Sequence, residues 1–165
     1  MNGSEAKLEH KRTLIIEDDP DGARSLQILL QLLGYEVQVA RSGMEGLRLA
    51  ALWEPENIIC DVSMPGMDGW SVARELRRHP FAMQVNLIAL TAFGTESDQR
   101  RSYEAGFDHH LVKPLDHSLL LKLLRRPATS IPPAGIPVVH AHPARAASSG
   151  SPDERSSAAL SSSQS

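Results

Sequence analysis

The segment Leu14-Ile15-Ile16-Glu17-Asp18-Asp19-Pro20 decides how the rest of the chain can fold. Its apolar run, which starts at Thr13, is rich in β-branched residues and ends abruptly in acids, as a buried strand does at a polar edge. Asp19 can accept hydrogen bonds from the first turn of a following helix. Pro20 suits that turn because the N–H it lacks would have no partner there. The sequence therefore predicts a strand, an acidic turn and a helix.

The same alternation of strand and helix continues downstream. Further strands are predicted at 35–39, 57–60, 87–90 and about 107–112. Helices are predicted at about 20–33, 42–54, 68–79, 95–105 and 116–126. Uninterrupted apolar strands are typical of a parallel sheet covered on both faces by helices. Successive β–α units therefore predict a doubly wound α/β domain.

Residues at the predicted helix ends support these boundaries. Ser42, with Glu45 three residues later, forms a capping box, and Asp68 can cap the third helix. Gly34 is placed to end the first helix. Arg77 and Arg78 end the third helix, where we expect both to be exposed.

Composition places the protein among ordinary globular proteins. Of its 165 residues, 41% are hydrophobic and 22% are charged, and the formal net charge is −3. This charge predicts no general attraction to nucleic acid or to a membrane surface. Cys60 is the only cysteine, so no intramolecular disulfide can form, which suits a reducing compartment and predicts a cytoplasmic protein.

The two ends of the chain differ in composition from the middle. Residues 1–10 are polar and are expected to be a flexible leader, while the predicted domain covers 11–126. Residues 127–165 contain 6 of the 11 prolines, together with many alanines and serines. Such a segment buries too little apolar surface to offset the entropy of ordering it, so we expect a disordered tail.

Charged residues occur where three predicted strands end. Glu17 and Asp18 follow the first strand, Asp61 follows the third and Lys113 follows the fifth. In an open parallel sheet the carboxyl ends of the strands frame the ligand crevice, so these side chains should converge. Gathered carboxylates repel one another unless a cation joins them, and a small set of oxygen ligands indicates Mg²⁺. A lysine nearby would offer positive charge to phosphoryl oxygens.

At these positions the chain resembles the receiver domain of response regulators in two-component and phosphorelay signalling, including receivers attached to hybrid histidine kinases. The resemblance covers about residues 11–126 and implies the flavodoxin-like strand order 2-1-3-4-5. Four motifs carry it, in the order and spacing of the family: Leu14-Ile15-Ile16-Glu17-Asp18-Asp19-Pro20, Cys60-Asp61-Val62-Ser63-Met64-Pro65-Gly66-Met67-Asp68-Gly69, Ala89-Leu90-Thr91-Ala92 and Leu111-Val112-Lys113-Pro114.

The resemblance implies a role for each matching residue at the site. Asp61 would be the phosphoacceptor, a carboxylate nucleophile that forms an aspartyl-phosphate. Glu17 and Asp18 would bind Mg²⁺ together with Asp61 and the backbone carbonyl of Ser63. Lys113 would contact the phosphoryl group, and its bond to Pro114 is usually cis in the family.

The resemblance also implies a switch and a reset. Thr91 matches the hydroxyl residue that moves to a phosphoryl oxygen on activation. His110 stands where many receivers carry a tyrosine or phenylalanine that turns inward with the threonine. Ser63 and Phe93 flank the approach of the water that hydrolyses the aspartyl-phosphate. Neither residue orients water well, so we expect slow self-dephosphorylation.

The predicted function is a phosphorylation-dependent signalling switch and not an enzyme with a substrate of its own. The phosphoryl donor would be a sensor histidine kinase or a histidine phosphotransfer protein, and an unidentified downstream protein would receive the signal through protein–protein contacts. Neither direct DNA binding nor membrane association is expected, because little ordered-looking sequence follows Arg126 and no apolar run is long enough to span a bilayer.

Other interpretations of the same residues remain open. Acid clusters are often solvated surface, and Thr91 could simply end a strand. A hydrolase with an aspartyl-phosphate intermediate would share Asp61, Mg²⁺ and Lys113, although such enzymes usually carry a second acid where Ser63 stands. A receiver fold that is never phosphorylated is disfavoured by the complete acceptor set. A flavin-binding protein is disfavoured by the acids after the first strand.

Overall fold

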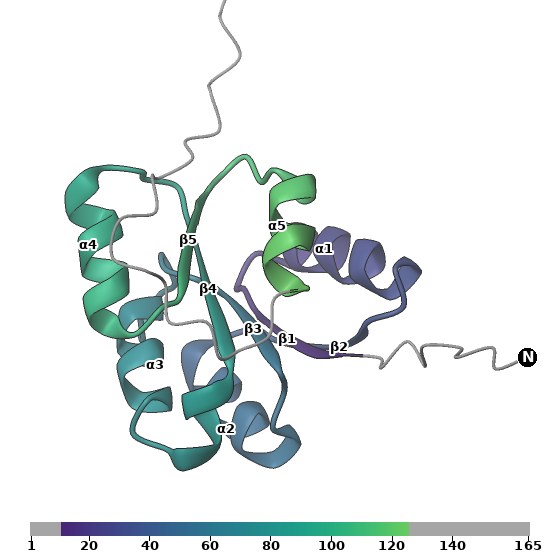
Figure 1. Cartoon of the computed structure of the whole chain (residues 1–165), viewed down its shortest axis with the longest axis horizontal. Helices are drawn as coiled ribbons and strands as arrows, with labels where there is room; N and C mark the ends of the chain where they lie inside the picture. The colour runs from purple at the N-terminus through teal and green to yellow at the C-terminus, as the bar shows by residue number, and fades with distance from the viewer. Residues whose placement is uncertain (1–10, 126–165) are drawn as a thin grey trace, which may run out of the picture.

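The computed structural model describes residues 11–125, so the predictions for residues 1–10 and for the tail lie outside the described residues. Figure 1 shows strands alternating with helices along the chain. The strands are β1 (Arg12–Ile16), β2 (Glu36–Ala40), β3 (Asn57–Asp61), β4 (Asn86–Thr91) and β5 (His109–Val112). The helices are α1 (Pro20–Leu32), α2 (Gly43–Trp53), α3 (Gly69–Leu76), the 3₁₀ helix η1 (Pro80–Gln84), α4 (Glu96–Ala105) and α5 (His117–Leu124).

The sheet confirms the predicted topology. Its order is β2-β1-β3-β4-β5, and every neighbouring pair of strands is parallel. Ile16 of β1 pairs with Cys60 of β3, so the residues that follow them, Glu17 and Asp61, stand at the same edge. Thr91 pairs with Val112, which places Lys113 one residue beyond the pair at that edge. The register thus brings the predicted site residues together.

Helices cover both faces of the sheet, as the apolar strands predict. In Figure 1, α2, α3 and α4 lie on one side of the sheet, while α1 and α5 lie on the other. The two apolar cores match this division. One core joins Ile16, Cys60 and Ala89 to Val72 and Leu76 of α3. The other core joins strand residues such as Ile15 and Ile59 to Leu26, Leu30, Leu120 and Leu124 of α1 and α5.

Side-chain caps fix where the helices begin. Asp19, Ser42 and Asp68 each accept a hydrogen bond from the backbone N–H three residues later, as predicted. Thr95 and Asp116 do the same for α4 and α5. Each bond satisfies an N–H that has no partner within its own helix.

Three details differ from the sequence-based expectation. The chain forms η1 after α3, and β5 begins at His109 and not near Phe107, which is buried in the core. Arg77 is not exposed: its side chain has a relative exposure of 20%, whereas that of Arg78 is 76%.

Within residues 11–125, we find no helix with the length and apolar character that a membrane span requires.

Candidate functional site

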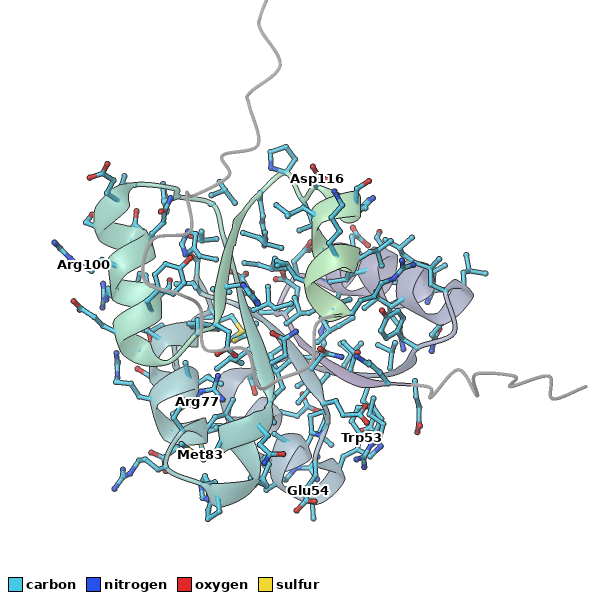
Figure 2. The ribbon with its side chains drawn as sticks, viewed as in Figure 1. Trp53, Glu54, Arg77, Met83, Arg100 and Asp116 are labelled. Carbon is cyan, nitrogen blue, oxygen red and sulfur yellow. The ribbon has the colours of Figure 1, made fainter. Side chains whose placement is uncertain are left out.

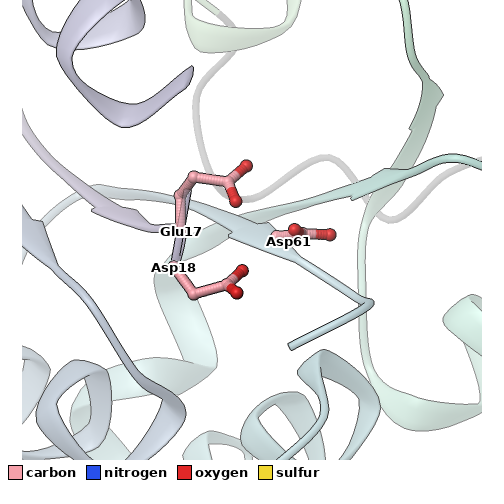
Figure 3. Close-up of side chains that lie close together, drawn as sticks. All are labelled: Glu17, Asp18 and Asp61. Atoms are coloured by element: carbon pink, nitrogen blue, oxygen red, sulfur yellow. The ribbon is translucent and has the colours of Figure 1, made fainter. Parts of the chain in front are cut away.

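Three carboxylates meet at the edge formed by the ends of β1 and β3. Glu17 and Asp18 follow β1, and Asp61 is the last residue of β3. Figure 3 shows the three side chains close together, and one oxygen from each lies within 4.8 Å of the others. Glu17 and Asp61 are buried, with relative exposures of 4% and 5%. Two of the three charges are therefore largely removed from water.

Lys113 brings the positive charge that the sequence predicts. Its ammonium lies 2.9 Å from Glu17 Oε2 and 3.4 Å from Asp61 Oδ2. Its backbone N–H donates to the carbonyl of Thr91, which extends the β4–β5 ladder to the site. The bond from Lys113 to Pro114 is cis, as the resemblance implied. One ammonium thus serves two buried carboxylates, with a third carboxylate beside them.

Burial and the neighbouring charges shift the pKa values of Glu17 and Lys113. Burial raises the pKa of Glu17, and Asp61 adds to the rise, while Lys113 and the Asp19 N–H oppose it. Burial lowers the pKa of Lys113, but its contacts with Glu17 and Asp61 outweigh that effect and the net shift is upward. The three carboxylates and the single ammonium leave an excess of negative charge at the site. A divalent cation that prefers oxygen ligands would relieve that excess, so the donor set fits Mg²⁺.

The loop after β3 holds Asp61 in place. The Ser63 N–H donates to Asp61 Oδ1 over 2.9 Å, which fixes the orientation of the carboxylate. Gly69, the first residue of α3, packs against the same backbone: a Cβ added there would lie 2.4 Å from the Asp61 carbonyl oxygen. Only glycine lets α3 begin this close to Asp61.

Thr91 is the last residue of β4, one position beyond the partner of Asp61 in the sheet, and Phe93 follows it in the β4–α4 loop. Thr91 is buried, with a relative exposure of 2%, and its hydroxyl oxygen accepts a hydrogen bond of 3.1 Å from the Phe93 N–H. Phe93 itself has a relative exposure of 65%. In this structure the Thr91 hydroxyl is therefore bonded to the β4–α4 loop.

His110 lies on β5 and is half-buried between the sheet and α4. Its Nδ1 lies 2.9 Å from the hydroxyl oxygen of Ser102, which also accepts from the indole N–H of Trp70. The sequence did not mark Ser102 or Trp70 as functional. One serine in a polar helix has no distinguishing pattern, and Trp70 has the apolar spacing of a core residue.

Comparison with known proteins identifies the family of this chain. Residues 13–125 match the response regulator receiver domain. The chain belongs to this family. A receiver is the phosphoacceptor domain of two-component response regulators, so the predicted family and the fold class are both confirmed.

Related receivers occur in longer regulators. The chain is 36% identical over 114 residues to the DNA-binding dual master transcriptional regulator RpaA of Synechocystis, covering 69% of this chain and 47% of that protein. It is 34% identical to the response regulator PleD of Caulobacter vibrioides over 114 residues, covering 69% of this chain and 25% of PleD. The chain thus spans about half of RpaA and a quarter of PleD.

Solved receivers share the three-dimensional arrangement. A putative response regulator from Chloroflexus aurantiacus has a TM-score of 0.66 and 35% identity, covering 70% of this chain and 98% of that one. The receiver of a sensor histidine kinase from Pseudomonas aeruginosa has a TM-score of 0.67 and 31% identity, covering 73% and 98%. That receiver is described with a magnesium ion coordinated in its active site cleft.

Proposed function

We propose that this receiver accepts a phosphoryl group on Asp61 from a phosphohistidine of a sensor histidine kinase or a histidine phosphotransfer protein. The observation that carries the proposal is the position of Asp61, which is buried between the acidic pair Glu17–Asp18 and the Lys113 ammonium. In the proposal Mg²⁺ is held by Glu17, Asp18 and Asp61, with the backbone carbonyl of Ser63 as a further ligand.

The chemistry is a displacement at phosphorus. An Asp61 oxygen forms the new P–O bond while the P–N bond of the phosphohistidine breaks, and its electron pair leaves on the imidazole nitrogen. Lys113, whose ammonium already reaches Asp61, balances the charge on the phosphoryl oxygens. Glu17, Asp18 and Asp61 would hold Mg²⁺, which would supply positive charge against the charge of the phosphoryl oxygens. The remaining contribution of the chain is positioning, through the Ser63 N–H and the close packing of Gly69.

The phosphorylated form signals through contacts with a downstream protein. Thr91 is the switch residue in this proposal, because its hydroxyl stands beside the site and holds only a loop N–H that it can release. RpaA is described as DNA-binding, but the receiver matches less than half of it, and we propose no DNA contact for residues 11–125. The buried free thiol of Cys60 suits a reducing compartment and supports a cytoplasmic protein.

Acetyl phosphate supplies a phosphoryl donor that tests the proposal without the natural partner. The full chain incubated with acetyl phosphate and Mg²⁺ should gain one phosphoryl group by intact mass, and peptide mapping should place it on Asp61. Asp61→Asn should abolish the gain, whereas Asp21→Asn, which changes an exposed acid on α1, should not. Labelling of Asp61→Asn to the wild-type level would refute the assignment.

A further inference from the structure

The three carboxylates of the site differ in what holds them in place. Glu17 and Asp61 both accept from the Lys113 ammonium, and each also accepts a hydrogen bond from a backbone N–H. Among residues 11–125, no group donates to the carboxylate of Asp18 and no cation pairs with it. The position of this carboxylate near Asp61 therefore depends on the backbone that carries it.

The backbone that carries Asp18 lies against the end of β2. Ile16 pairs with Ala40, the last residue of β2, and the Glu17 N–H donates to the Ala40 carbonyl over 3.0 Å. Arg41 follows directly, and its guanidinium nitrogen Nη2 donates to the backbone carbonyl of Asp18 over 3.0 Å. In the described part of the chain, no backbone N–H donates to that carbonyl. Arg41 is therefore what ties the backbone of Asp18 to the neighbouring strand.

The start of α2 holds Arg41 itself. The Arg41 N–H donates to Glu45 Oε2 over 2.7 Å, and the Glu45 N–H donates to the Ser42 hydroxyl oxygen over 3.2 Å. Glu45 thus reaches back past the capping residue Ser42 and bonds the residue before it. With the backbone of Arg41 fixed, fewer conformations are lost when its side chain makes a bond. The first turn of α2 thus presents the guanidinium to the Asp18 carbonyl.

We propose that Arg41 is a positioning residue for the magnesium site, because its bond to the Asp18 carbonyl holds the Asp18 carboxylate where it can bind Mg²⁺ with Glu17 and Asp61. Figure 3 shows Glu17 and Asp18 extending toward Asp61 from adjacent residues, so a change in the backbone at Asp18 moves its carboxylate relative to the other two. The inference rests on the magnesium site of the proposed function and deepens it by naming a residue outside the acidic cluster that sets the affinity for the metal.

Two effects of Arg41 on Mg²⁺ binding have opposite signs. A positive charge near the acidic cluster repels a divalent cation, so removal of the guanidinium would tighten binding. A positioning residue favours the geometry that the metal needs, so its removal weakens binding. Groups that orient metal ligands contribute about 10- to 100-fold to metal affinity. Arg41 is exposed, so water and salt screen its repulsion. The net effect of removing Arg41 is a loss of affinity.

The first test measures the Kd for Mg²⁺ from amide chemical shifts of the full chain during titration with MgCl₂. Arg41→Ala should raise the Kd about 10-fold, the lower end of the effect of groups that orient metal ligands. Arg41→Lys keeps a donor and the charge, so it should restore most of the affinity. Arg48→Ala removes an exposed arginine of α2 and should leave the Kd unchanged. Equal or tighter Mg²⁺ binding by Arg41→Ala would overturn the inference.

The second test is made in EDTA and needs neither metal nor phosphate. The Asp19 N–H donates to Glu17 Oε1 in the turn that Arg41 holds, so its hydrogen exchange should be faster in Arg41→Ala than in wild type. The Ser63 N–H, which donates to Asp61 from the loop after β3, should exchange at the wild-type rate. A residue with a general structural role would change both rates. An unchanged exchange rate at Asp19 would also overturn the inference.

The outcomes separate the role of Arg41 from the proposed function. Phosphorylation of Asp61 is read independently, by the mass gained from acetyl phosphate. A wild-type chain that binds Mg²⁺ and gains phosphate, with Arg41→Ala binding Mg²⁺ equally well, overturns the role of Arg41 alone. A wild-type chain that binds no Mg²⁺ overturns the magnesium site and the role of Arg41 with it. If Arg41→Ala does not fold, Arg41→Gln, which removes the charge and shortens the side chain, carries both tests.

Discussion

Arg77→Ala should destabilise the receiver strongly without changing the acidic site around Asp61. Arg77 follows α3 and donates to the backbone carbonyls of Gly106, Ala82 and Val85, with nitrogen–oxygen distances of 2.8 Å to Gly106 and 3.0 Å to Val85. It also forms an ion pair of 2.7 Å with Asp108. These acceptors lie in η1 and before β4 and β5, so one guanidinium ties together three segments. Figure 2 shows Arg77 in the lower part of the molecule, far from Asp116 at the other end.

The expected loss follows from the acceptors that alanine leaves behind. A hydrogen bond to a charged group contributes about 1.5–3 kcal/mol when buried. Arg77 and Asp108 have side-chain exposures of 20% and 34%, so water can replace part of what is lost. Asp108 also keeps a bond of 2.7 Å from the Leu87 N–H. Counting about half of the four bonds as a net loss, each at the lower value because of this partial exposure, gives roughly 3 kcal/mol, or a melting temperature lower by about 10 °C.

Urea and thermal unfolding of Arg77→Ala and Arg78→Ala measure this difference with a matched control. Arg78 is the next residue, but its side chain is 76% exposed and pairs with Glu75 at the surface. Its loss should cost less than about 0.5 kcal/mol. Well below the melting temperature, both variants should accept phosphate at the wild-type rate. Equal stability of the two variants would refute the reasoning.

Two further predictions concern the site itself. Asp18→Ala should bind Mg²⁺ more weakly but keep or gain thermal stability in EDTA, because one of three mutually repelling carboxylates is removed. Calorimetric titration measures the Mg²⁺ affinity, and melting curves in EDTA measure the stability. A melting temperature in EDTA below that of wild type would contradict this prediction. Ser63→Asn combined with Phe93→Glu should shorten the lifetime of the phosphorylated form by roughly 10-fold, because both side chains can orient water. Decay of the phosphorylated protein in Mg²⁺ measures this, and equal decay in wild type would count against it.

The local parts of the fold could be predicted from sequence, because their causes are local. Asp19, Ser42 and Asp68 cap helices through bonds to residues three positions away, and apolar periodicity marks the elements between them. Strand order depends on pairing between distant segments, and only the family resemblance implied it. Arg77 shows the limit most clearly. Its partners Gly106 and Asp108 are 29 and 31 residues away, and its nearer acceptors are backbone carbonyls, which no residue type marks in the sequence.

The acidic centre of the site was predictable for a different reason. Glu17, Asp61 and Lys113 each follow an apolar strand, and parallel strands bring their carboxyl ends to one edge. Residues that are far apart in the sequence can therefore be predicted to lie close together in the fold. Ser102 obeys no such rule, because it lies in the polar helix α4 and nothing beside it in the sequence indicates its contacts. Trp70 of α3 and His110 of β5 meet its hydroxyl only in the folded chain.

The charge imbalance around Asp61 suggests how phosphorylation of this residue would change the conformation of the β4–α4 loop. Two buried carboxylates share the Lys113 ammonium, and burial, with a smaller contribution from Asp61, raises the pKa of Glu17. In the proposed function, a phosphoryl group on Asp61 brings new oxygen atoms to this cluster, one of which can accept from Thr91. Thr91 has one hydroxyl, and in the structure it holds the Phe93 N–H. The oxygen accepts from that N–H, while its hydrogen can donate to a phosphoryl oxygen. In the proposed function, movement of the side chain toward Asp61 to make that second bond would loosen the β4–α4 loop, and this movement of one buried hydroxyl would turn a local electrostatic event into a change of conformation.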